Sequence, residues 1–553
     1  MAHPDSPNWD REVDVVVLGT GAAGLTAALT AAVDGASVAV YEKAPTVGGT
    51  TAVSGGVVWT PAHHRSPDVD LPVEDALTYL RAQALGAMDE DLVGTFVRTG
   101  ESVIDFVEKH SDARFEIAPG YLDYKPELPG GKAVGGRSLS PMPYEVSRVG
   151  EWAEKITTFP ADWSNVGFDA ETRARLNADV DDRGGEIVVA GGALIAGLLK
   201  GLLDRGVVPV TDARALELIS DSGSVIGVRI QLPGSEIVVR ARRGVILGTG
   251  GFEHNDAMRK QYQRAPIGTE WTTGAPSNTG DGITAGIKAG ADVALMDDAW
   301  WGPTIPLPKG PWFALSERSV PGTFIVNERG ERFMNESLPY VEAAHHMYGG
   351  DFGQGDGPGE NVPAWMIMDT RCRGRYLFAG LTAKQPIPKS WLASGVIVKA
   401  DTIAELAEKI GVPAENLVAT TEKFNGFARD GVDKDFGRGA SGYDHYYGDI
   451  TNKPNPSLGP VDKGPFYAVK MVPGDLGTKG GIVTDEDGRA LRPDGSVING
   501  LYAAGNTSAP VMGHTYAGPG ATIGPAMVFG YLAALDAKAK ADAAASSTAA
   551  SGA

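Results

Sequence analysis

The feature that most constrains the fold is a glycine-rich turn at residues 19–24, which follows a run of β-branched residues. Residues 13–18 read Val-Asp-Val-Val-Val-Leu, a pattern typical of a buried parallel strand. The turn reads Gly-Thr-Gly-Ala-Ala-Gly, and residues 25–33 then favour an alanine-rich helix. A strand that enters a helix through such a turn is the first half of a dinucleotide-binding unit. The residues expected to contact the cofactor here are Gly19, Gly21, Ala22, Ala23 and Gly24.

The second half of this unit is a short strand predicted over residues 37–41, which ends at Glu42. Glu42 follows Gly24 by 18 residues, so its carboxylate is placed to accept a hydrogen bond from a ribose hydroxyl. The glycines let the backbone approach a pyrophosphate closely, and the helix N-terminus favours its negative charge. Strand, glycines, helix, strand and acid in this order predict an α/β fold with a Rossmann-like domain.

A second loop of small residues, 47–56, distinguishes FAD from NAD as the cofactor. It reads Val-Gly-Gly-Thr-Thr-Ala-Val-Ser-Gly-Gly and comes shortly after the acid. A two-domain flavoprotein needs such a loop to pass under the rest of an extended FAD, although glycine clusters also mark ordinary surface loops. The contacts expected from this loop are Gly49, Thr50, Thr51, Ser54, Gly55 and Gly56.

Three later segments also have the character of cofactor loops. Residues 244–251 return to a buried strand that ends in glycines, and residues 278–282 open a helix. Residues 506–530 contain no Asp, Glu, Lys or Arg and run into an apolar helix that starts near residue 523, whose N-terminus favours electron-rich atoms. The contacts predicted from these segments, and from Gly505 just before the last of them, are Gly250, Gly251, Asn278, Asp281, Gly505, Asn506, Ala521 and Ile523.

Composition excludes several other classes of function. The net charge of −20 argues against electrostatic binding to nucleic acid or to anionic membranes. The single cysteine, Cys372, excludes an internal disulfide and a multi-cysteine metal site. The adjacent pairs His63-His64 and His345-His346 do not converge on one ligand, so no metal is expected. No signal-peptide pattern and no apolar run of about 18 residues is present, which favours a cytoplasmic protein without a transmembrane segment.

The amino-acid composition changes near residue 298, since tryptophans and prolines cluster over residues 300–313. We take this as the start of an inserted α+β catalytic domain over residues 299–466, in which residues 323–333 suggest a hairpin. The FAD-binding domain is then discontinuous, with a first part at residues 1–298 and a second part at residues 467–536. The alanine- and serine-rich tail, residues 537–553, lacks a core pattern and is predicted to be disordered.

These motifs together resemble the succinate dehydrogenase and fumarate reductase flavoprotein superfamily, which shares the fingerprint, Glu42-Lys43, the 48–56 loop and Gly505-Asn506. Within it, the chain is similar to the 3-ketosteroid Δ1-dehydrogenases over nearly all of residues 12–536. The specific part of the resemblance lies in residues 120–131, residues 335–340 (Asn-Glu-Ser-Leu-Pro-Tyr) and residues 515–524. Lys43 is counted among the cofactor contacts on this basis.

The resemblance implies a role for each of five residues. Tyr516 and the Gly520 backbone N–H would hold the C3 carbonyl oxygen of a 3-ketosteroid. Tyr340 would remove a proton from C2, Tyr124 would hydrogen-bond Tyr340, and the C1 hydride would pass to flavin N5. Tyr121 would line the same cavity. The chemistry is reasonable because two donors at the ketone oxygen stabilise an enolate, whereas a tyrosine with an ordinary pKa of ~10 needs help to act as a base.

Three alternatives remain open from the sequence. The nearest is a 3-ketosteroid Δ4-(5α)-dehydrogenase, which uses similar parts on another ring-A bond. A soluble fumarate reductase is less favoured, because such an enzyme needs a cationic pocket where this chain has tyrosines. A flavin protein without catalytic activity would not need three tyrosines at these positions. FAD is expected to bind non-covalently, because no histidine occupies a position recognised for covalent attachment. The electron acceptor and the oligomeric state stay undetermined.

Overall fold

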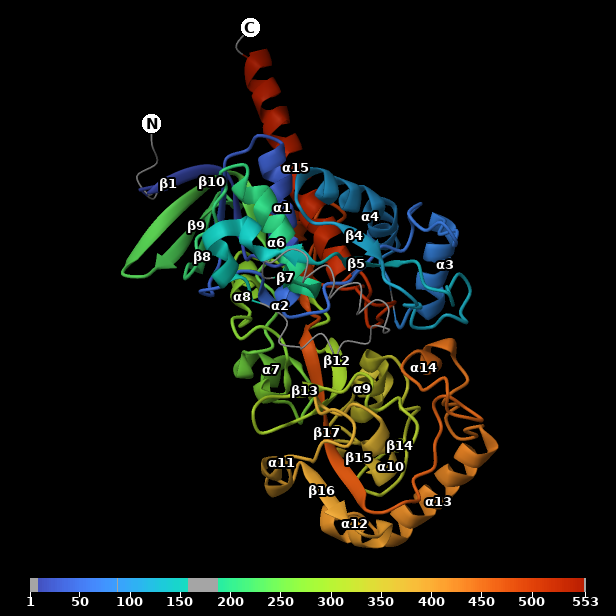
Figure 1. Cartoon of the computed structure of the whole chain (residues 1–553). Coiled ribbons are helices and arrows are strands. Elements are labelled where there is room, and N and C mark those ends of the chain that lie inside the picture. Colours follow the sequence, from blue (N-terminus) through green and yellow to red (C-terminus); the bar gives the residue numbers. More distant parts are fainter. Residues whose placement is uncertain (1–7, 87, 158–186, 552–553) are drawn as a thin grey trace.

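The computed structural model describes residues 8–86, 88–157 and 187–551, and two large sheets organise them (Figure 1). The first sheet has seven strands within the described residues: β1 (Arg11–Leu18), β2 (Val38–Tyr41), β8 (Arg214–Asp221), β9 (Ser224–Leu232), β10 (Ser235–Leu247), β19 (Arg489–Leu491) and β20 (Val497–Ala503). β1 lies between β2 and β10 and runs parallel to both, and β20 runs parallel to β10. The remaining pairs, including β8 with β9 and β9 with β10, are antiparallel. The parallel centre is the arrangement that the fingerprint predicts, and the fold class expected from the sequence is confirmed.

Two helices, α1 (Ala22–Val33) and α15 (Ile523–Ser551), contact the strands of the first sheet, and α6 (Ala190–Leu203) and α4 (Glu90–His110) pack on these two helices. α1 and α15 lie side by side in Figure 1, although almost the whole chain separates them in sequence. Their backbones are so close that a Cβ atom on Gly530 would lie 2.5 Å from the carbonyl oxygen of Ala23. The C-terminal segment and the N-terminal fingerprint therefore form one layer.

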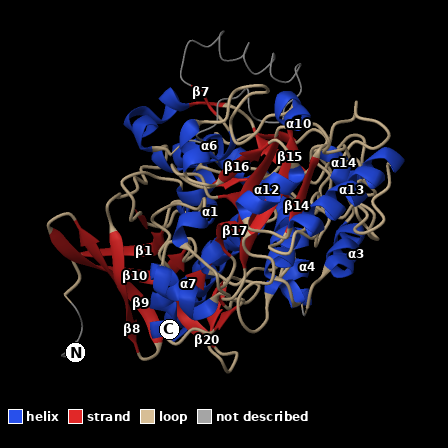
Figure 2. Ribbon diagram, turned by 90° about the horizontal axis from the view of Figure 1, so that it is seen from below, coloured by secondary structure: helices blue, strands red, loops and turns tan. Residues whose placement is uncertain are grey.

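The second sheet is antiparallel and is built on one long strand, β17 (Phe466–Thr478). Its other strands are β12 (Ala299–Ile305), β13 (Trp312–Phe313), β14 (Thr323–Val326), β15 (Ala364–Asp369) and β16 (Ile397–Ala400). Its helices are α9 (Tyr340–Tyr348), α10 (Thr370–Arg375), α11 (Lys389–Ala393), α12 (Ile403–Ile410), α13 (Ala414–Asp430) and α14 (Gly442–Tyr446). Figure 2 shows the strands of this sheet and those of the first sheet in separate regions of the molecule.

Shorter elements connect these layers. A small sheet comprises β3 (Val58–Trp59), β4 (Phe115–Ile117) and β5 (Ser138–Pro141), and two strand pairs comprise β6 (Tyr144–Glu145) with β7 (Ile187–Val188) and β11 (Val293–Ala294) with β18 (Gly481–Ile482). The other α-helices are α2 (Gly49–Ala52), α3 (Val73–Gln83), α7 (Asp256–Tyr262) and α8 (Asp281–Lys288). Short 3-10 segments are η1 (Val146–Lys155), η3 (Thr269–Trp271), η4 (Asp351–Gly353) and η5 (Gly505–Thr507).

The prediction of a hairpin over residues 323–333 is wrong: the turn forms, but the second strand does not. The turn exists, because the Asn327 N–H donates to the Glu331 carbonyl oxygen at 3.0 Å. The chain after it forms no strand, however, and β14 pairs with β15 instead. The physical reason is that Arg332 turns away from the sheet to a buried ion pair with Asp433 at 2.8 Å.

The tail also differs from the prediction, since α15 continues to Ser551. Its first part packs on the fold: Ala537 is fully buried, and Lys538 forms an ion pair with Asp34 at 3.1 Å. Alanine has the highest helix propensity, so a segment without a core pattern still extends a helix that has already begun. Among the described residues, no helix is long and apolar enough to cross a membrane, and no group of three or more His, Cys, Asp or Glu side chains is placed to hold a metal ion.

Candidate active site

The fingerprint turn forms a cradle of backbone atoms at the end of β1. Gly19 has φ +99°, and a Cβ on it would lie 2.2 Å from the Gly248 carbonyl oxygen. A Cβ on Gly24 would lie 2.1 Å from the carbonyl oxygen of Gly19, so only glycine fits at both positions. α1 begins at Ala22 with Gly21 as its N-cap and without a side-chain cap. The N-cap glycine offers no side chain of its own, so the N–H groups of the first turn that Thr51 does not take are left for a ligand.

Glu42 lies at the end of β2 and is held by the fingerprint itself. Its carboxylate accepts hydrogen bonds from the Thr20 backbone N–H at 3.0 Å and from the Thr20 hydroxyl at 2.6 Å. The other carboxylate oxygen accepts from the Ala44 N–H at 2.9 Å. A carboxylate has about four acceptor positions, so a ribose hydroxyl still finds one on this buried group.

The second predicted loop packs directly against the fingerprint helix. Thr51 Oγ1 accepts a hydrogen bond from the Ala22 N–H at 3.2 Å, and the Ser54 hydroxyl donates to the Thr51 carbonyl oxygen. Thr50 Oγ1 accepts from the Asn278 side chain at 3.0 Å. Gly49 starts α2, and Gly55 and Gly56 lie at the loop's end, where a Cβ on Gly56 would be 2.5 Å from the Ala190 backbone.

Five of the remaining predicted contacts lie in two groups, the first of which reaches the loop through the hydrogen bond between Asn278 and Thr50. Gly250 approaches Asn278 so closely that a Cβ would lie 2.6 Å from its side-chain oxygen, and Gly251 is similarly close to Thr478. Lys43 forms an ion pair with Asp281 at 3.1 Å, and Asp281 also pairs with Arg214 at 2.9 Å. The resulting layer of glycines, hydroxyls and amides fits the backbone of a dinucleotide cofactor.

The C-terminal stretch forms much of a small, nearly filled pocket beside the fingerprint helix. Gly505, Asn506 and Ala521 line this pocket, together with Trp300 and Lys479 from the second sheet. A Cβ on Gly505 would touch the Ala23 side chain at 3.3 Å, which brings the two predicted cofactor segments into contact. Ile523 is the first residue of α15, which starts beside the pocket. The residues present at the fingerprint, the 49–56 loop and this pocket therefore fit FAD.

Three of the predicted tyrosines form a buried triangle. The ring centroids of Tyr124 and Tyr340 are 5.6 Å apart, those of Tyr124 and Tyr516 5.4 Å, and those of Tyr340 and Tyr516 5.3 Å. Their exposed fractions are 4%, 6% and 7%. Phe313 packs on Tyr340, and Trp300 packs on Tyr516. The centre of the site is thus aromatic and uncharged, and it is suited to an apolar ligand with a polar atom.

Each tyrosine comes from a different part of the chain and is held by its neighbours. The Tyr124 N–H donates to the Ala517 carbonyl oxygen at 3.1 Å, which ties its loop to the one that carries Tyr516. Tyr340 is the first residue of α9, and the ion pair between Lys125 and Glu342 at 2.9 Å joins that helix to the Tyr124 loop.

Gly520 has a conformation that only glycine adopts readily. Its φ is +94°, and its carbonyl oxygen accepts a hydrogen bond from the Trp59 N–H at 3.1 Å. The Trp59 indole donates to Asp123 at 3.2 Å, and Asp123 forms a fully buried ion pair with Arg137 at 2.5 Å. This chain of contacts fixes Gly520 and Tyr124 relative to one another.

Burial opposes ionisation of all three tyrosines. It raises the pKa of Tyr340 well above 10, and the nearby Tyr516 adds to this rise. A hydrogen bond from Tyr124 acts in the opposite direction and lowers the pKa of Tyr340. The pKa of Tyr516 is raised by burial and is lowered in part by the Thr522 hydroxyl, whose oxygen lies 3.2 Å from the phenol.

Tyr121 does not join the triangle. It stacks on Tyr446 at 5.0 Å, and its hydroxyl lies 3.4 Å from that of Tyr447. The sequence reasoning missed α14, which carries Tyr446 and Tyr443 and is followed directly by Tyr447. The ring of Tyr443 is 4.9 Å from that of Tyr124. The signal available was the run Tyr-Asp-His-Tyr-Tyr at residues 443–447, which stands inside an otherwise polar stretch of the sequence.

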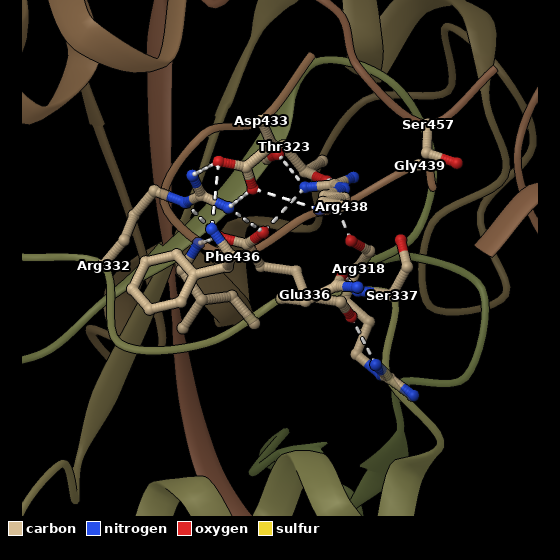
Figure 3. Close-up of polar contacts among 12 residues, drawn as sticks. Arg318, Thr323, Arg332, Glu336, Ser337, Asp433, Phe436, Arg438, Gly439 and Ser457 are labelled. Carbon is tan, nitrogen blue, oxygen red and sulfur yellow. Dashed lines mark hydrogen bonds and ion pairs between the residues drawn. The ribbon is translucent and has the colours of Figure 1, made fainter. Parts of the chain in front are cut away.

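A network of ion pairs holds the segment before Tyr340 (Figure 3). Arg332 binds the carboxylates of Glu336 at 2.7 Å and Asp433 at 2.8 Å. Arg438 contacts Glu336 at 3.2 Å and donates to the Thr323 carbonyl oxygen at 2.6 Å. All four charged groups are nearly inaccessible to solvent, so the network ties the Tyr340 segment to the loop that leads into α14.

A second buried cluster surrounds Asp298 on the other side of the site. Its carboxylate contacts Lys479 at 3.1 Å, His345 at 3.1 Å and His514 at 2.9 Å. The charge of Lys479 and the contact with His345 hold the pKa of Asp298 well below its usual range in spite of burial. The sequence reasoning did not predict this cluster, which links α9, the end of β17 and the loop before Tyr516.

Known proteins resemble the chain over almost its whole length. The FAD binding domain family matches residues 14–523. A 3-oxosteroid 1-dehydrogenase of Mycolicibacterium smegmatis is 54% identical over 95% of this chain and 97% of its own. The crystal structure of 3-ketosteroid Δ1-dehydrogenase from Sterolibacterium denitrificans, in complex with 1,4-androstadiene-3,17-dione, superposes with a TM-score of 0.90 at 36% identity and covers 96% of this chain and 100% of that one.

A more distant structure shares the fold. The 3-ketosteroid-Δ4-(5α)-dehydrogenase of Rhodococcus jostii has a TM-score of 0.68 at 23% identity and covers 96% of this chain and 98% of its own. The predicted family is confirmed by the closer matches: the chain belongs to the 3-oxosteroid 1-dehydrogenase family of FAD-dependent oxidoreductases.

Proposed function

We propose that the protein catalyses the 1,2-dehydrogenation of ring A of 3-ketosteroids, with FAD as the bound cofactor. The observation that carries the proposal is the triangle of Tyr124, Tyr340 and Tyr516, which is buried and bordered by Phe313 and Trp300. Relatives named 3-oxosteroid 1-dehydrogenase, at 54% identity, support the same substrate class.

The first role is stabilisation of charge on the C3 oxygen. The Tyr516 hydroxyl and the Gly520 backbone N–H serve as the two donors to this oxygen. Their donation strengthens when the ketone becomes enolate-like, because the oxygen then carries more negative charge. One donor of this kind contributes roughly 3–4 kcal/mol to the transition state in favourable cases.

The second role is removal of the C2 proton by Tyr340. A buried tyrosine is a poor base at neutral pH, since burial raises its pKa well above 10. The hydrogen bond from Tyr124 lowers the pKa of Tyr340 and so favours the phenolate. Tyr124 therefore acts on the base, not on the substrate. Tyr121 and α14 extend the aromatic wall beyond ring A.

The cofactor is held by the fingerprint cradle, Glu42, the 49–56 loop and the pocket at Gly505 and Asn506. The chemistry that bound FAD supplies is acceptance of the hydride from C1. The attachment is non-covalent, because no histidine occupies a position recognised for a covalent link. An electron acceptor outside the chain then reoxidises the cofactor, and the residues identify no particular one.

We also propose that the chain is divided into the two domains expected from the sequence. Residues 1–298 and 467–536 form the FAD-binding part, and residues 299–466 form the catalytic part that contributes Tyr340. The two sheets support this division except near residue 466. There β17 (Phe466–Thr478), which the division assigns almost entirely to the FAD-binding part, pairs with the strands of the second sheet. The site lies where the Tyr340 helix meets the loops of Tyr124 and Tyr516.

The test is product analysis with two steroids of different ring A. Purified protein with added FAD and an artificial electron acceptor is given androst-4-ene-3,17-dione or its 5α-saturated counterpart. The proposal requires a 1,4-diene-3-one from the first substrate. Formation of a 4-ene from the second substrate alone would instead assign the Δ4 reaction. The variant Tyr340→Phe is expected to bind the steroid and to lose most of the turnover.

A further inference from the structure

Asp298 is a buried carboxylate that is anchored at the end of the second sheet. It directly precedes β12, and Lys479 directly follows β17, at the place where Ala299 and Thr478 pair across these two strands. The Lys479 backbone N–H donates to the Asp298 carbonyl oxygen at 3.1 Å. The Ala299 N–H donates to the Asp298 carboxylate at 2.9 Å, and Asp298 is only 2% exposed. This carboxylate is therefore held on a rigid part of the fold.

Three basic side chains converge on the same carboxylate. Its Oδ1 contacts Nε2 of His345 at 3.1 Å, and its Oδ2 contacts Nδ1 of His514 at 2.9 Å and Nζ of Lys479 at 3.1 Å. Burial alone would raise the pKa of Asp298, but the charge of Lys479 and the contact with His345 hold it well below its usual range. An ionised carboxylate only accepts hydrogen bonds, so each imidazole donates a ring N–H to it.

The His345 contact reaches the helix of the proposed base. His345 lies five residues after Tyr340, which is the first residue of α9. The same helix is also held by the ion pair between Glu342 and Lys125, but those two side chains are 17% and 26% exposed. The side chains of His345 and Asp298 are 7% and 2% exposed. Water competes less for a buried contact, so the one with Asp298 restrains α9 more firmly.

The His514 contact reaches the loop of the proposed donor to the C3 oxygen. His514 lies two residues before Tyr516, and Lys479 Nζ also donates to the carbonyl oxygen of Thr515, between them, at 3.3 Å. The same ammonium lies 4.8 Å from the ring centre of Trp300, which packs on Tyr516. The carboxylate and its lysine thus hold this loop at two neighbouring residues.

We infer that Asp298 is a positioning residue for the proposed reaction: it holds two histidines, His345 and His514, on one carboxylate. One histidine belongs to the helix of Tyr340 and the other to the loop of Tyr516. This bridge therefore fixes the base relative to the donor, whose ring centroids are 5.3 Å apart. The inference rests on the proposed function, in which these two tyrosines act on adjacent carbon atoms of one steroid ring.

The experiment removes one end of the bridge at a time, in His345→Leu and His514→Leu. The carboxylate is left in place, because its removal would leave Lys479 as an unpaired buried charge. FAD-loaded protein is mixed anaerobically with saturating androst-4-ene-3,17-dione, and the bleaching of the flavin is followed. Its first-order rate constant does not depend on the fraction of active protein, whereas its amplitude does. Displacement by about 1 Å slows a reaction on the order of 100-fold, so each variant should lose about 10- to 100-fold in rate constant and keep its amplitude per bound FAD.

Conservative variants separate positioning from packing. His345→Gln and His514→Asn keep an N–H donor near the place of the lost ring nitrogen, so their rate constants should return to within about threefold of the wild type. The matched control is His346→Leu. His346 is the next residue of α9, but its side chain is exposed, so its rate constant should equal that of the wild type.

The double variant His345→Leu/His514→Leu tests whether the two histidines act as one bridge. Its loss should be close to the larger single loss, because the first substitution has already broken the bridge. Losses that multiply would mean that the histidines act separately and would overturn the inference. Rate constants within about twofold of the wild type in both single variants would also overturn it, as would a fall in amplitude alone.

Tyr340→Phe distinguishes a failure of this inference from a failure of the proposed function. If Tyr340→Phe bleaches as fast as the wild type, the proposed function fails, and the role of Asp298 fails with it. If Tyr340→Phe is inactive while both leucine variants keep the wild-type rate constant, only the role of Asp298 fails.

Discussion

Gly520 is the position where a single methyl group should disrupt the site most selectively. In Gly520→Ala, the new Cβ would lie 2.4 Å from the Val57 carbonyl oxygen and 2.6 Å from the Trp59 nitrogen. Both are backbone atoms of β3 and its approach, so neither moves at low cost. The φ of +94° adds about 1–2 kcal/mol for an L-residue. Loss of the 3.1 Å hydrogen bond from Trp59 to Gly520 adds about 1 kcal/mol more.

The loop must therefore move, at a cost of about 2–3 kcal/mol before the steric overlap is counted. Displacement of a donor by about 1 Å reduces rates on the order of 100-fold, so kcat should fall by about that factor. The assay is steady-state dehydrogenation of androst-4-ene-3,17-dione, with the thermal unfolding midpoint of the FAD-loaded protein measured in parallel. Retention of kcat within twofold and of the midpoint within one degree would refute the reasoning.

Gly426→Ala is the matched control for this substitution. Gly426 lies within α13, and a Cβ on it would meet no atom within 4 Å. Alanine is favoured over glycine inside a helix by about 1 kcal/mol, so this variant should be as stable as the wild type or slightly more stable. Its kcat should be unchanged, which would show that the loss in Gly520→Ala comes from the position of the added methyl group and not from the methyl group itself.

Three other predictions concern single side chains. Tyr516→Phe should lower kcat by about 100- to 1000-fold in the same assay, because it removes one donor to the C3 oxygen, and an unchanged kcat would exclude that role. Arg137→Met should reduce the free energy of unfolding by about 3–5 kcal/mol in denaturant titrations, because it leaves Asp123 buried without its partner at 2.5 Å, and a loss below 1 kcal/mol would contradict this. Burial and the nearby Asp475 raise the pKa of Glu253 to about 7, so the folded state favours the protonated form and the stability it contributes is lost as pH rises from about 4.5 through 7. Glu253→Gln should consequently be more stable than the wild type at pH 8 by about 2–3 kcal/mol and nearly equal to it at pH 4.5, and a smaller difference at pH 8 than at pH 4.5 would reverse that sign.

The sequence predicted those parts of the fold in which residues close together in the chain determine the structure. The strand, turn and helix at residues 13–33 form as expected because the turn at Gly19 and Gly24 admits only glycine. The contact between α1 and the C-terminal segment depends on small residues in the same way, since a Cβ on Gly530 would lie 2.5 Å from the Ala23 carbonyl oxygen.

Features that depend on distant pairing were not predictable from one sequence. Arg332 leaves the expected hairpin because its partner Asp433 lies 101 residues away, and no local pattern signals that ion pair. Asp298, Lys479 and His514 are separated in the same way and meet only in the folded chain. Tyr443 was overlooked because a tyrosine in a polar loop has no periodic pattern to mark it as buried.

The most direct test of the central claim is anaerobic mixing of the FAD-loaded protein with androst-4-ene-3,17-dione, followed by the flavin absorbance and the mass of the steroid. The account predicts bleaching of the flavin together with a product two mass units lighter that has the ultraviolet spectrum of a 1,4-diene-3-one. Flavin that stays oxidised with every 3-ketosteroid, while the reduced protein is reoxidised by fumarate, would contradict it. In that case the tyrosine triangle would have to be a packing feature of a different oxidoreductase.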